Sequence, residues 1–176
     1  MAFFKEELTK VKAFVFDVDG VLSSATQLLS PEGETVRTSN LKDGFALIYA
    51  VKIGIPIGII TGGNTIEVIS RCEKIGITNI YTGTLKKLPC LLDFLKKNNL
   101  NADEIMYMGD DLPDYPAMRM VGVPVCPSDA SPEIKAISHY ISDKKGGEGC
   151  VRDVIEQVLR SQGKWIDLEK MDWSVF

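Results

Sequence analysis

A run of apolar residues that ends in two aspartates constrains the fold of this chain more than any other feature. Five of the six residues at positions 13–18 are apolar and two of them are β-branched, which predicts a strand buried on both faces of a parallel sheet. Asp17 and Asp19 stand where this strand should end, and Gly20 allows a sharp turn after them. Open α/β sheets bind ligands at this carboxyl edge. Taken alone, the two acids fit a ligand site and an ordinary turn about equally well, because aspartate is common where strands give way to loops.

Polar residues follow three later apolar runs in the same way. These runs end near residues 60, 82 and 108, and the carboxyl ends of parallel strands lie along one edge of a sheet. The polar residues behind them are Thr61 and Gly62, Lys86 and Lys87, and Asp110, Asp111 and Asp114. Together with the first two aspartates they favour a phosphate or metal site over a set of unrelated turns.

Short apolar strands alternate with amphipathic helices along most of the chain. Strands are predicted at residues 56–60, 79–82, 105–108 and 121–125, and helices at residues 43–52, 66–75 and 85–97. This order predicts an α/β fold, a three-layer Rossmann-like parallel sheet with right-handed crossovers. Residues 23–39 contain Pro31 and Gly33 between two β-rich stretches, which predicts a β-hairpin flap after the first strand. The gaps between the motifs leave no room for a separate cap domain.

Length and composition fit one domain over residues 1–176. A chain of 176 residues, 45% of them hydrophobic, supports one full core, and two domains would be cramped. The tail, residues 163–176, is unusually apolar and contains both tryptophans. We expect it to dock on its own sheet or on a neighbouring subunit, and we favour the neighbour.

The net charge and the use of cysteine and histidine argue against several classes of function. The net charge of −4 disfavours a nucleic-acid or anionic-membrane surface. The chain begins without a signal-peptide pattern and has no apolar run long enough to span a bilayer, so we expect a cytoplasmic protein. The four cysteines are scattered and are expected to be reduced. His139 is the only histidine, so any general acid should be a carboxylate.

Four aspartates are expected to converge at the edge of the sheet: Asp17, Asp19, Asp110 and Asp111. Carboxylates are ionised at neutral pH and repel each other strongly unless a cation joins them. Oxygen ligands without imidazole or thiolate favour Mg²⁺. Ca²⁺ is the alternative, but these ligands lie on separate strand ends rather than in one continuous loop.

The ordered set D-x-D-G-V, a strand-terminal threonine, a lysine and G-D-D-x-x-D resembles the haloacid dehalogenase-like (HAD) phosphohydrolases. The resemblance implies that Asp17 is a nucleophile that becomes an aspartyl phosphate, and that Asp19 is the general acid for the leaving alcohol. It also implies that Mg²⁺ is held by Asp17, Asp110 and the Asp19 carbonyl. The Thr61 hydroxyl and the Gly62 amide would hold phosphoryl oxygens.

The same resemblance assigns a lysine and two further aspartates. Lys87 would neutralise charge on the phosphoryl group, and it is preferred to Lys86 because it precedes Leu88, as in the K-L pattern of the family. Lys86 also fits a solvated helix start. Asp111 would orient a metal-bound water. Asp114 would support Lys87 or its own loop, or would cap a helix.

Further segments narrow the resemblance to the 3-deoxy-D-manno-octulosonate 8-phosphate (KDO 8-phosphate) phosphatases of lipopolysaccharide biosynthesis. These features are the capless length, the hairpin, and residues 40–44, 71–72, 109–114 and 146–153. Family members are homotetramers in which neighbouring subunits complete each active site, so the resemblance implies the same assembly here. The substrate contacts it suggests are Lys42, Arg71, Gly146 and Gly147, although the two glycines also fit a flexible turn before a helix.

One position departs from the family pattern. Many members have Thr-Gly-Arg at the positions where this chain has Thr61, Gly62 and Gly63. The sugar carboxylate would then need another basic residue, for which arginine is better suited than lysine. The candidates are Lys42, Arg71, Lys74, Lys144 and Arg152. A phosphatase for nine-carbon sugar acid (KDN or N-acylneuraminate) 9-phosphates therefore stays an alternative. A non-catalytic HAD-like partner of a cytidylyltransferase is a third, which the full set of catalytic residues disfavours.

Overall fold

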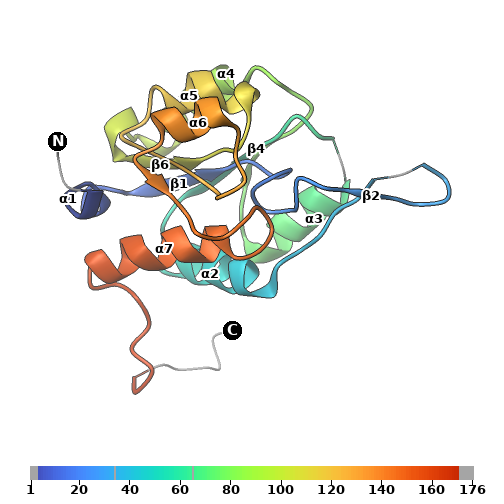
Figure 1. The fold of residues 1–176 in the computed structure, drawn as a ribbon. Helices are drawn as coiled ribbons and strands as arrows, with labels where there is room; N and C mark the ends of the chain where they lie inside the picture. Colours follow the sequence, from blue (N-terminus) through green and yellow to red (C-terminus); the bar gives the residue numbers. More distant parts are fainter. Residues whose placement is uncertain (1–3, 34, 65, 171–176) are drawn as a thin grey trace.

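A parallel sheet forms the centre of the protein in the computed structural model, which describes residues 4–33, 35–64 and 66–170 (Figure 1). The sheet has six strands in the order β5-β4-β1-β6-β7-β8, and every neighbouring pair is parallel. Its strands are β1 (Ala13–Phe16), β4 (Ile57–Ile60), β5 (Asn79–Tyr81), β6 (Ile105–Met108), β7 (Val123–Cys126) and β8 (Tyr140–Ile141). The predicted α/β fold is confirmed.

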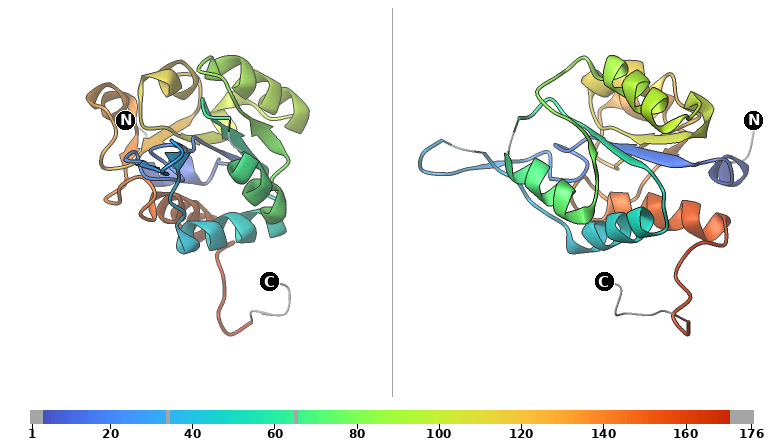
Figure 2. Two further views of the ribbon diagram at one scale, coloured as in Figure 1. Left: turned by 90° about the vertical axis from the view of Figure 1, so that its right-hand side faces the viewer. Right: turned by 180° about the vertical axis from the view of Figure 1, so that it is seen from behind.

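Helices cover both faces of the sheet and make three layers (Figures 1 and 2). One face carries α1 (Phe4–Leu8), α2 (Leu41–Lys52), α3 (Ile66–Ile75) and α7 (Cys150–Ser161), and the other carries α4 (Lys87–Asn98), α5 (Tyr115–Met118) and α6 (Pro132–Ile137). Side chains of β1 alternate between the two cores, because successive strand residues point to opposite faces. Phe14 and Phe16 pack with the first group of helices, and Ala13 and Val15 pack with the second.

The register of the central strands brings their carboxyl ends together. Phe16 of β1 pairs with Ile59 of β4 on one side and with Met108 of β6 on the other. The three strands therefore end at almost the same level. Asp17 and Thr61, which follow β1 and β4, consequently share one edge of the sheet.

Two helices begin at residues other than the predicted ones. Helix α2 begins at Leu41 rather than at residue 43, because the Asn40 side chain accepts hydrogen bonds from the amides of Lys42 (2.9 Å) and Asp43 (3.2 Å). Helix α4 begins at Lys87 rather than at residue 85.

Among the described residues, no helix has the length and apolar character needed to cross a membrane.

The predicted hairpin projects from the carboxyl edge of the sheet (Figures 1 and 2). It consists of the antiparallel strands β2 (Leu28–Leu29) and β3 (Thr35–Val36), so its paired part is much shorter than residues 23–39. Both leucines of β2 are exposed, at 68% and 72% of their surface. In the described residues no separate cap domain covers the sheet edge, and the hairpin is the element that stands beside it.

The first part of the predicted tail folds back on its own chain. The ring of Trp165 meets that of Tyr49 edge-on at 5.4 Å, and the Arg152 guanidinium lies 4.6 Å from the indole. The Tyr49 hydroxyl also donates to the carbonyl of Lys164 at 3.0 Å. Trp165 therefore has an aromatic and a cationic partner within its own chain, and docking of the tail on a neighbour stays a prediction. Of the other apolar residues that carried the expectation, Ile166 is half-buried and Leu168 is 73% exposed. Met171, Trp173, Val175 and Phe176 lie outside the described residues.

Candidate active site

A polar crevice lies at the carboxyl ends of β1, β4 and β6. The hairpin projects from the same edge of the sheet (Figure 1). The lining of the crevice contains all of the predicted catalytic and metal-binding residues. The residues that line it are Asp17, Asp19, Ala25, Thr61, Gly62, Gly63, Leu85, Lys87, Asp110, Asp111, Pro113 and Asp114. Tertiary folding therefore joins segments that are about 90 residues apart in the sequence, as expected for the strand ends of one parallel sheet.

Lys87 lies at the base of the crevice between two carboxylates. Its ammonium is 2.5 Å from Asp17 Oδ2 and 2.8 Å from Asp114 Oδ1, and only 3% of the residue is exposed. The Tyr107 hydroxyl, from β6, donates to the same Asp114 oxygen at 2.8 Å. Lys86 is exposed at the start of α4. Of the two lysines that the sequence offered, Lys87 is the one that faces the aspartates.

Burial shapes the acidity of this cluster. Desolvation, followed by the charge of Asp114, raises the pKa of Asp17 to about 8 against the opposing charge of Lys87. The same two causes raise the pKa of Asp110 to about 7. Burial by itself would lower the pKa of Lys87, but the charges of Asp17 and Asp114 outweigh it and raise that pKa. The single buried lysine does not balance the carboxylates, so the cluster is short of positive charge.

The oxygens of this cluster fit a hard divalent cation. Asp17, Asp110 and Asp114 each offer one carboxylate oxygen, and the three atoms lie within 4.8 Å of one another. Within the described structure, Asp110 Oδ1 is buried and has no hydrogen-bond partner. A buried carboxylate oxygen without a partner is costly unless a proton or a cation meets it. An all-oxygen donor set of this kind suits Mg²⁺.

Asp114 is better placed to support the site than to bind a cation. Its Oδ1 already accepts from Lys87 and Tyr107, and its Oδ2 accepts from the Asp110 amide at 3.3 Å. The residue is fully buried. This agrees with the predicted role of Asp114 as a support for Lys87. The role of Tyr107 was not predicted from the sequence, because a tyrosine in an apolar strand resembles a core residue.

A glycine lets the loop after β1 pass against Asp110. Gly20 adopts a positive φ of +85°, and a Cβ there would lie only 2.0 Å from Asp110 Oδ2. No side chain fits in that space, and positive φ favours glycine. The glycine of the D-x-D-G motif is therefore needed for the approach of the two acidic loops as well as for the turn.

The carboxylate of Asp19 is bound by residues of the hairpin segment and not by residues of the buried acidic cluster. The Arg37 guanidinium donates from Nε to Asp19 Oδ1 at 2.6 Å and from Nη2 to Oδ2 at 2.9 Å. The Gln27 side-chain amide also donates to Oδ1. Sequence reasoning missed both residues, because they sit in a polar, β-rich stretch with no motif.

Thr61 and Gly62 occupy the wall of the crevice formed by β4. Thr61 is 3% exposed, and its Oγ1 accepts from the Gly63 amide at 3.1 Å. Helix α3 begins a few residues later, at Ile66. Hydroxyl and amide groups in a loop that leads into a helix are well suited to bind phosphoryl oxygens.

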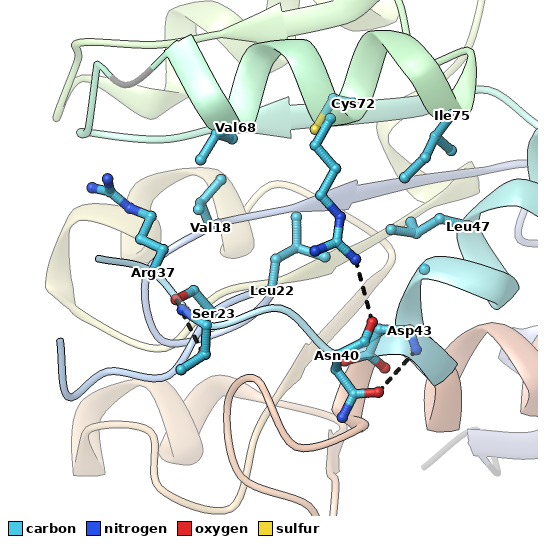
Figure 3. Close-up of a pocket in the computed structure, with 13 residues that line it drawn as sticks. Val18, Leu22, Ser23, Arg37, Asn40, Asp43, Leu47, Val68, Cys72 and Ile75 are labelled. Atoms are coloured by element: carbon cyan, nitrogen blue, oxygen red, sulfur yellow. Dashed lines mark hydrogen bonds between the residues drawn. The ribbon is translucent and has the colours of Figure 1, made fainter. Parts of the chain in front are cut away.

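Two of the predicted substrate contacts are basic residues that lie outside this crevice. A separate, mostly apolar pocket lies between α2 and α3 (Figure 3). Arg71 is among the residues that line it, and its guanidinium donates to the Asn40 carbonyl at 3.4 Å. Lys42 borders a groove along α7 together with Lys144 and Arg152. Within the described chain, neither side chain lines the crevice that holds Asp17.

The other two predicted contacts, Gly146 and Gly147, pack behind the loop that follows β1. The Gly147 amide donates to the Val21 carbonyl at 2.8 Å, and the Gly146 amide donates to Asp129 Oδ1 at 3.0 Å. Neither glycine is among the described residues that line the crevice. Their contacts support the loop that follows β1.

Comparison with known proteins identifies the class of protein to which this chain belongs. The fold is that of a haloacid dehalogenase-like hydrolase, and the model of that family matches residues 73–155. The 3-deoxy-D-manno-octulosonate 8-phosphate phosphatase of Escherichia coli K12 is 36% identical over 154 residues, which cover 88% of this chain and 82% of that protein. The phosphatase of the same name from Yersinia pestis is 32% identical over 159 residues, 90% of this chain and 85% of that protein.

Solved structures lead to the same assignment. The Yersinia pestis phosphatase superposes with a TM-score of 0.89 at 31% identity, covering 93% of this chain and 88% of that one. The phosphatase of Moraxella catarrhalis, in complex with magnesium, phosphate and KDO, has a TM-score of 0.87 at 34% identity, covering 93% and 94%. The chain belongs to the family of 3-deoxy-D-manno-octulosonate 8-phosphate phosphatases within the haloacid dehalogenase-like hydrolases.

Proposed function

We propose that this protein is a Mg²⁺-dependent phosphomonoester hydrolase that releases phosphate from KDO 8-phosphate in lipopolysaccharide biosynthesis. The observation that carries the proposal is the buried carboxylate of Asp17, which lines the polar crevice beside Lys87 and Asp110. The fold relative from Moraxella catarrhalis, which holds magnesium, phosphate and KDO, supports the choice of metal and of substrate.

Asp17 acts as the nucleophile in this mechanism. One of its oxygens attacks phosphorus as the bond to the leaving alcohol breaks, which gives an aspartyl phosphate that water then hydrolyses. Lys87, 2.5 Å away, holds this carboxylate in place and neutralises charge on the phosphoryl group. Asp17, Asp110 and the backbone carbonyl of Asp19 are the ligands we assign to Mg²⁺. When bound, the ion supplies the positive charge that the buried carboxylates and the phosphoryl group require.

The remaining crevice residues complete the reaction. Asp19 donates a proton to the leaving alcohol and later accepts one from the attacking water. The Thr61 hydroxyl and the Gly62 amide hold phosphoryl oxygens, and Asp111 orients the water. Asp111 is exposed at the rim of the crevice, a position open to solvent.

The proposed substrate contacts depend on the proposed assembly of subunits. Residues 1–176 form one domain, and the protein acts in the cytoplasm as a homotetramer whose neighbours complete each crevice. The exposed leucines of β2 belong to the hairpin that projects from the same edge of the sheet as the crevice (Figure 1), which supports contact with a neighbour at that point. Lys42, Arg71 and the loop that contains Gly146 and Gly147 would then serve substrate across a subunit boundary.

Phosphate release tests the proposed function directly. We expect Mg²⁺-dependent release from KDO 8-phosphate with a much higher kcat/KM than from a nine-carbon sugar acid 9-phosphate, and loss of release in EDTA. Asp17→Asn should reduce release to the background rate. Asp103→Asn is the matched control, because this exposed aspartate precedes β6 at the opposite edge of the sheet.

Three results would contradict parts of the proposal. Full activity in Asp17→Asn would exclude the aspartyl phosphate. A preference for the nine-carbon substrate would keep the chemistry and change the substrate. The absence of metal-dependent release from either compound, together with stable binding to a cytidylyltransferase, would favour a non-catalytic partner.

A further inference from the structure

We propose that Arg37 is a positioning residue that holds the Asp19 carboxylate at the phosphate-binding edge of the crevice, and that Gly63 provides the space for it. The inference rests on the proposed phosphatase function, because Asp19 has a proton to deliver only in that reaction. Arg37 lies just beyond β3, so the hairpin supplies this contact to the active site.

The geometry of the pair is that of a bidentate clamp. Two parallel hydrogen bonds, of 2.6 and 2.9 Å, join the guanidinium of Arg37 to both carboxylate oxygens of Asp19. Only 15% of the Arg37 side chain and 32% of the Asp19 side chain are exposed. A bidentate and largely shielded pair fixes the orientation of the carboxylate, unlike a single ion pair in open solvent.

Arg37 also lines the apolar pocket that contains Arg71. The Arg37 side chain lies beside Val18 in the wall of the apolar pocket, so it stands between that pocket and the crevice (Figure 3). Gln27, on the opposite arm of the hairpin, donates to the same Asp19 oxygen as Arg37 Nε. Both arms of the hairpin therefore meet on one carboxylate.

Gly63 makes this approach possible. A Cβ at this position would lie 2.8 Å from Arg37 Nη2 and 3.4 Å from Asp19 Oδ2. The first distance is too short for an undisturbed contact, so an alanine would push the tip of Arg37 away. Gly63 does not have a positive φ, so Gly63→Ala should disturb the clamp without straining the backbone.

The orientation of Asp19 matters only for part of the chemistry. Asp19 enters this step protonated. As the bond from phosphorus to the leaving oxygen breaks and the bond to Asp17 forms, its proton moves to that oxygen, and the carboxylate that remains is the form that Arg37 holds by two hydrogen bonds. An alkyl alcohol needs this proton because its alkoxide is a poor leaving group. The p-nitrophenolate ion leaves without it. Loss of the clamp should therefore slow alkyl phosphates and spare p-nitrophenyl phosphate.

The test compares three substrates with wild type, Arg37→Met, Arg37→Lys and Gly63→Ala, all with Mg²⁺. The substrates are KDO 8-phosphate, glycerol phosphate, which is an alkyl phosphate without a carboxylate, and p-nitrophenyl phosphate. For Arg37→Met we expect kcat to fall by about tenfold to a hundredfold on both alkyl phosphates and by less than about threefold on the aryl phosphate. Gly63→Ala should show the same split at smaller size, and Arg37→Lys should restore part of kcat.

Arg160→Met is the matched control. Arg160 also donates twice to a carboxylate, that of Glu156, at 2.8 and 2.6 Å, but it is exposed on α7. Its removal should give no difference between alkyl and aryl phosphates.

Each other outcome overturns the inference. An equal loss on all three substrates would mean that Arg37 is merely structural. A loss confined to KDO 8-phosphate, mainly in KM, would mean that Arg37 recognises the substrate carboxylate instead of positioning Asp19. In both cases the wild type remains an active phosphatase. A wild type that hydrolyses none of the three would refute the proposed function together with this inference.

Discussion

Tyr107→Phe is a direct test of the buried network beneath the crevice. Tyr107 and Asp114 are both fully buried, and the phenol donates to Asp114 Oδ1 at 2.8 Å. Burial, followed by the charge of Asp114, raises the pKa of Tyr107 well above its ordinary value, so the hydroxyl keeps its proton and remains a donor. The substitution removes one oxygen and leaves the ring in place, so the lost hydrogen bond should dominate its effect.

The size of the effect follows from the kind of bond. A hydrogen bond to a charged group contributes about 1.5–3 kcal/mol. Asp114 Oδ1 keeps its contact with Lys87, at 2.8 Å, which places the expected loss near the lower part of that range, about 2 kcal/mol. For a chain of this size, that loss corresponds to a fall in Tm of about 4–8 °C. The value of kcat should fall as well, because Asp114 helps to hold Lys87.

Urea unfolding followed by circular dichroism measures the free energy, and Tyr81→Phe is the control. Tyr81 also donates to an aspartate, Asp93, at 2.7 Å, but the side chain of that aspartate is 44% exposed. Water can replace the lost donor there, so the control should lose clearly less stability. A loss below about 0.5 kcal/mol for Tyr107→Phe, or equal losses in the two variants, would refute the reasoning.

The two remaining predictions concern the metal and the pH. Mg²⁺ at about a hundred times its Kd should stabilise the wild type by about 2.7 kcal/mol. Asp110→Asn should lose this gain in a thermal melt, and without metal it should be at least as stable as the wild type, because Asp110 Oδ1 is buried without a partner. An unchanged Mg²⁺ shift would contradict Asp110 as a ligand. Burial raises the pKa of Asp43, so the folded state binds its proton more tightly than the unfolded chain, whose pKa is about 3.9. The free energy of unfolding should therefore fall as the pH rises from about 3.9 through the raised pKa. Asp43→Asn, which keeps the oxygen that accepts from the Arg152 amide, should lose that decline. Parallel pH curves from urea unfolding would show the prediction to be wrong.

The sequence by itself determined the sheet and the location of the crevice. Apolar runs and helical periodicity are local properties, and they predict the central strands within a few residues. Because parallel strands end at a common edge, the acids after β1 and β6 and the threonine after β4 could be placed together before any contact was known. Lys87 could be chosen over Lys86 only through the resemblance, because the leucine that follows it matches the K-L pattern of the family, and the structure places Lys87 between two carboxylates.

Only the tertiary structure decided which side chains meet around those residues. Arg37 and Asp19 are 18 positions apart and joined by the path of the hairpin, and Tyr107 belongs to a strand whose pattern looks entirely like core. Trp165 docks on its own chain because Tyr49 and Arg152 lie within reach. Such contacts depend on distances between elements, which local patterns do not contain. Propensity and periodicity act over a few residues, whereas the charge balance of the crevice depends on packing across the whole sheet.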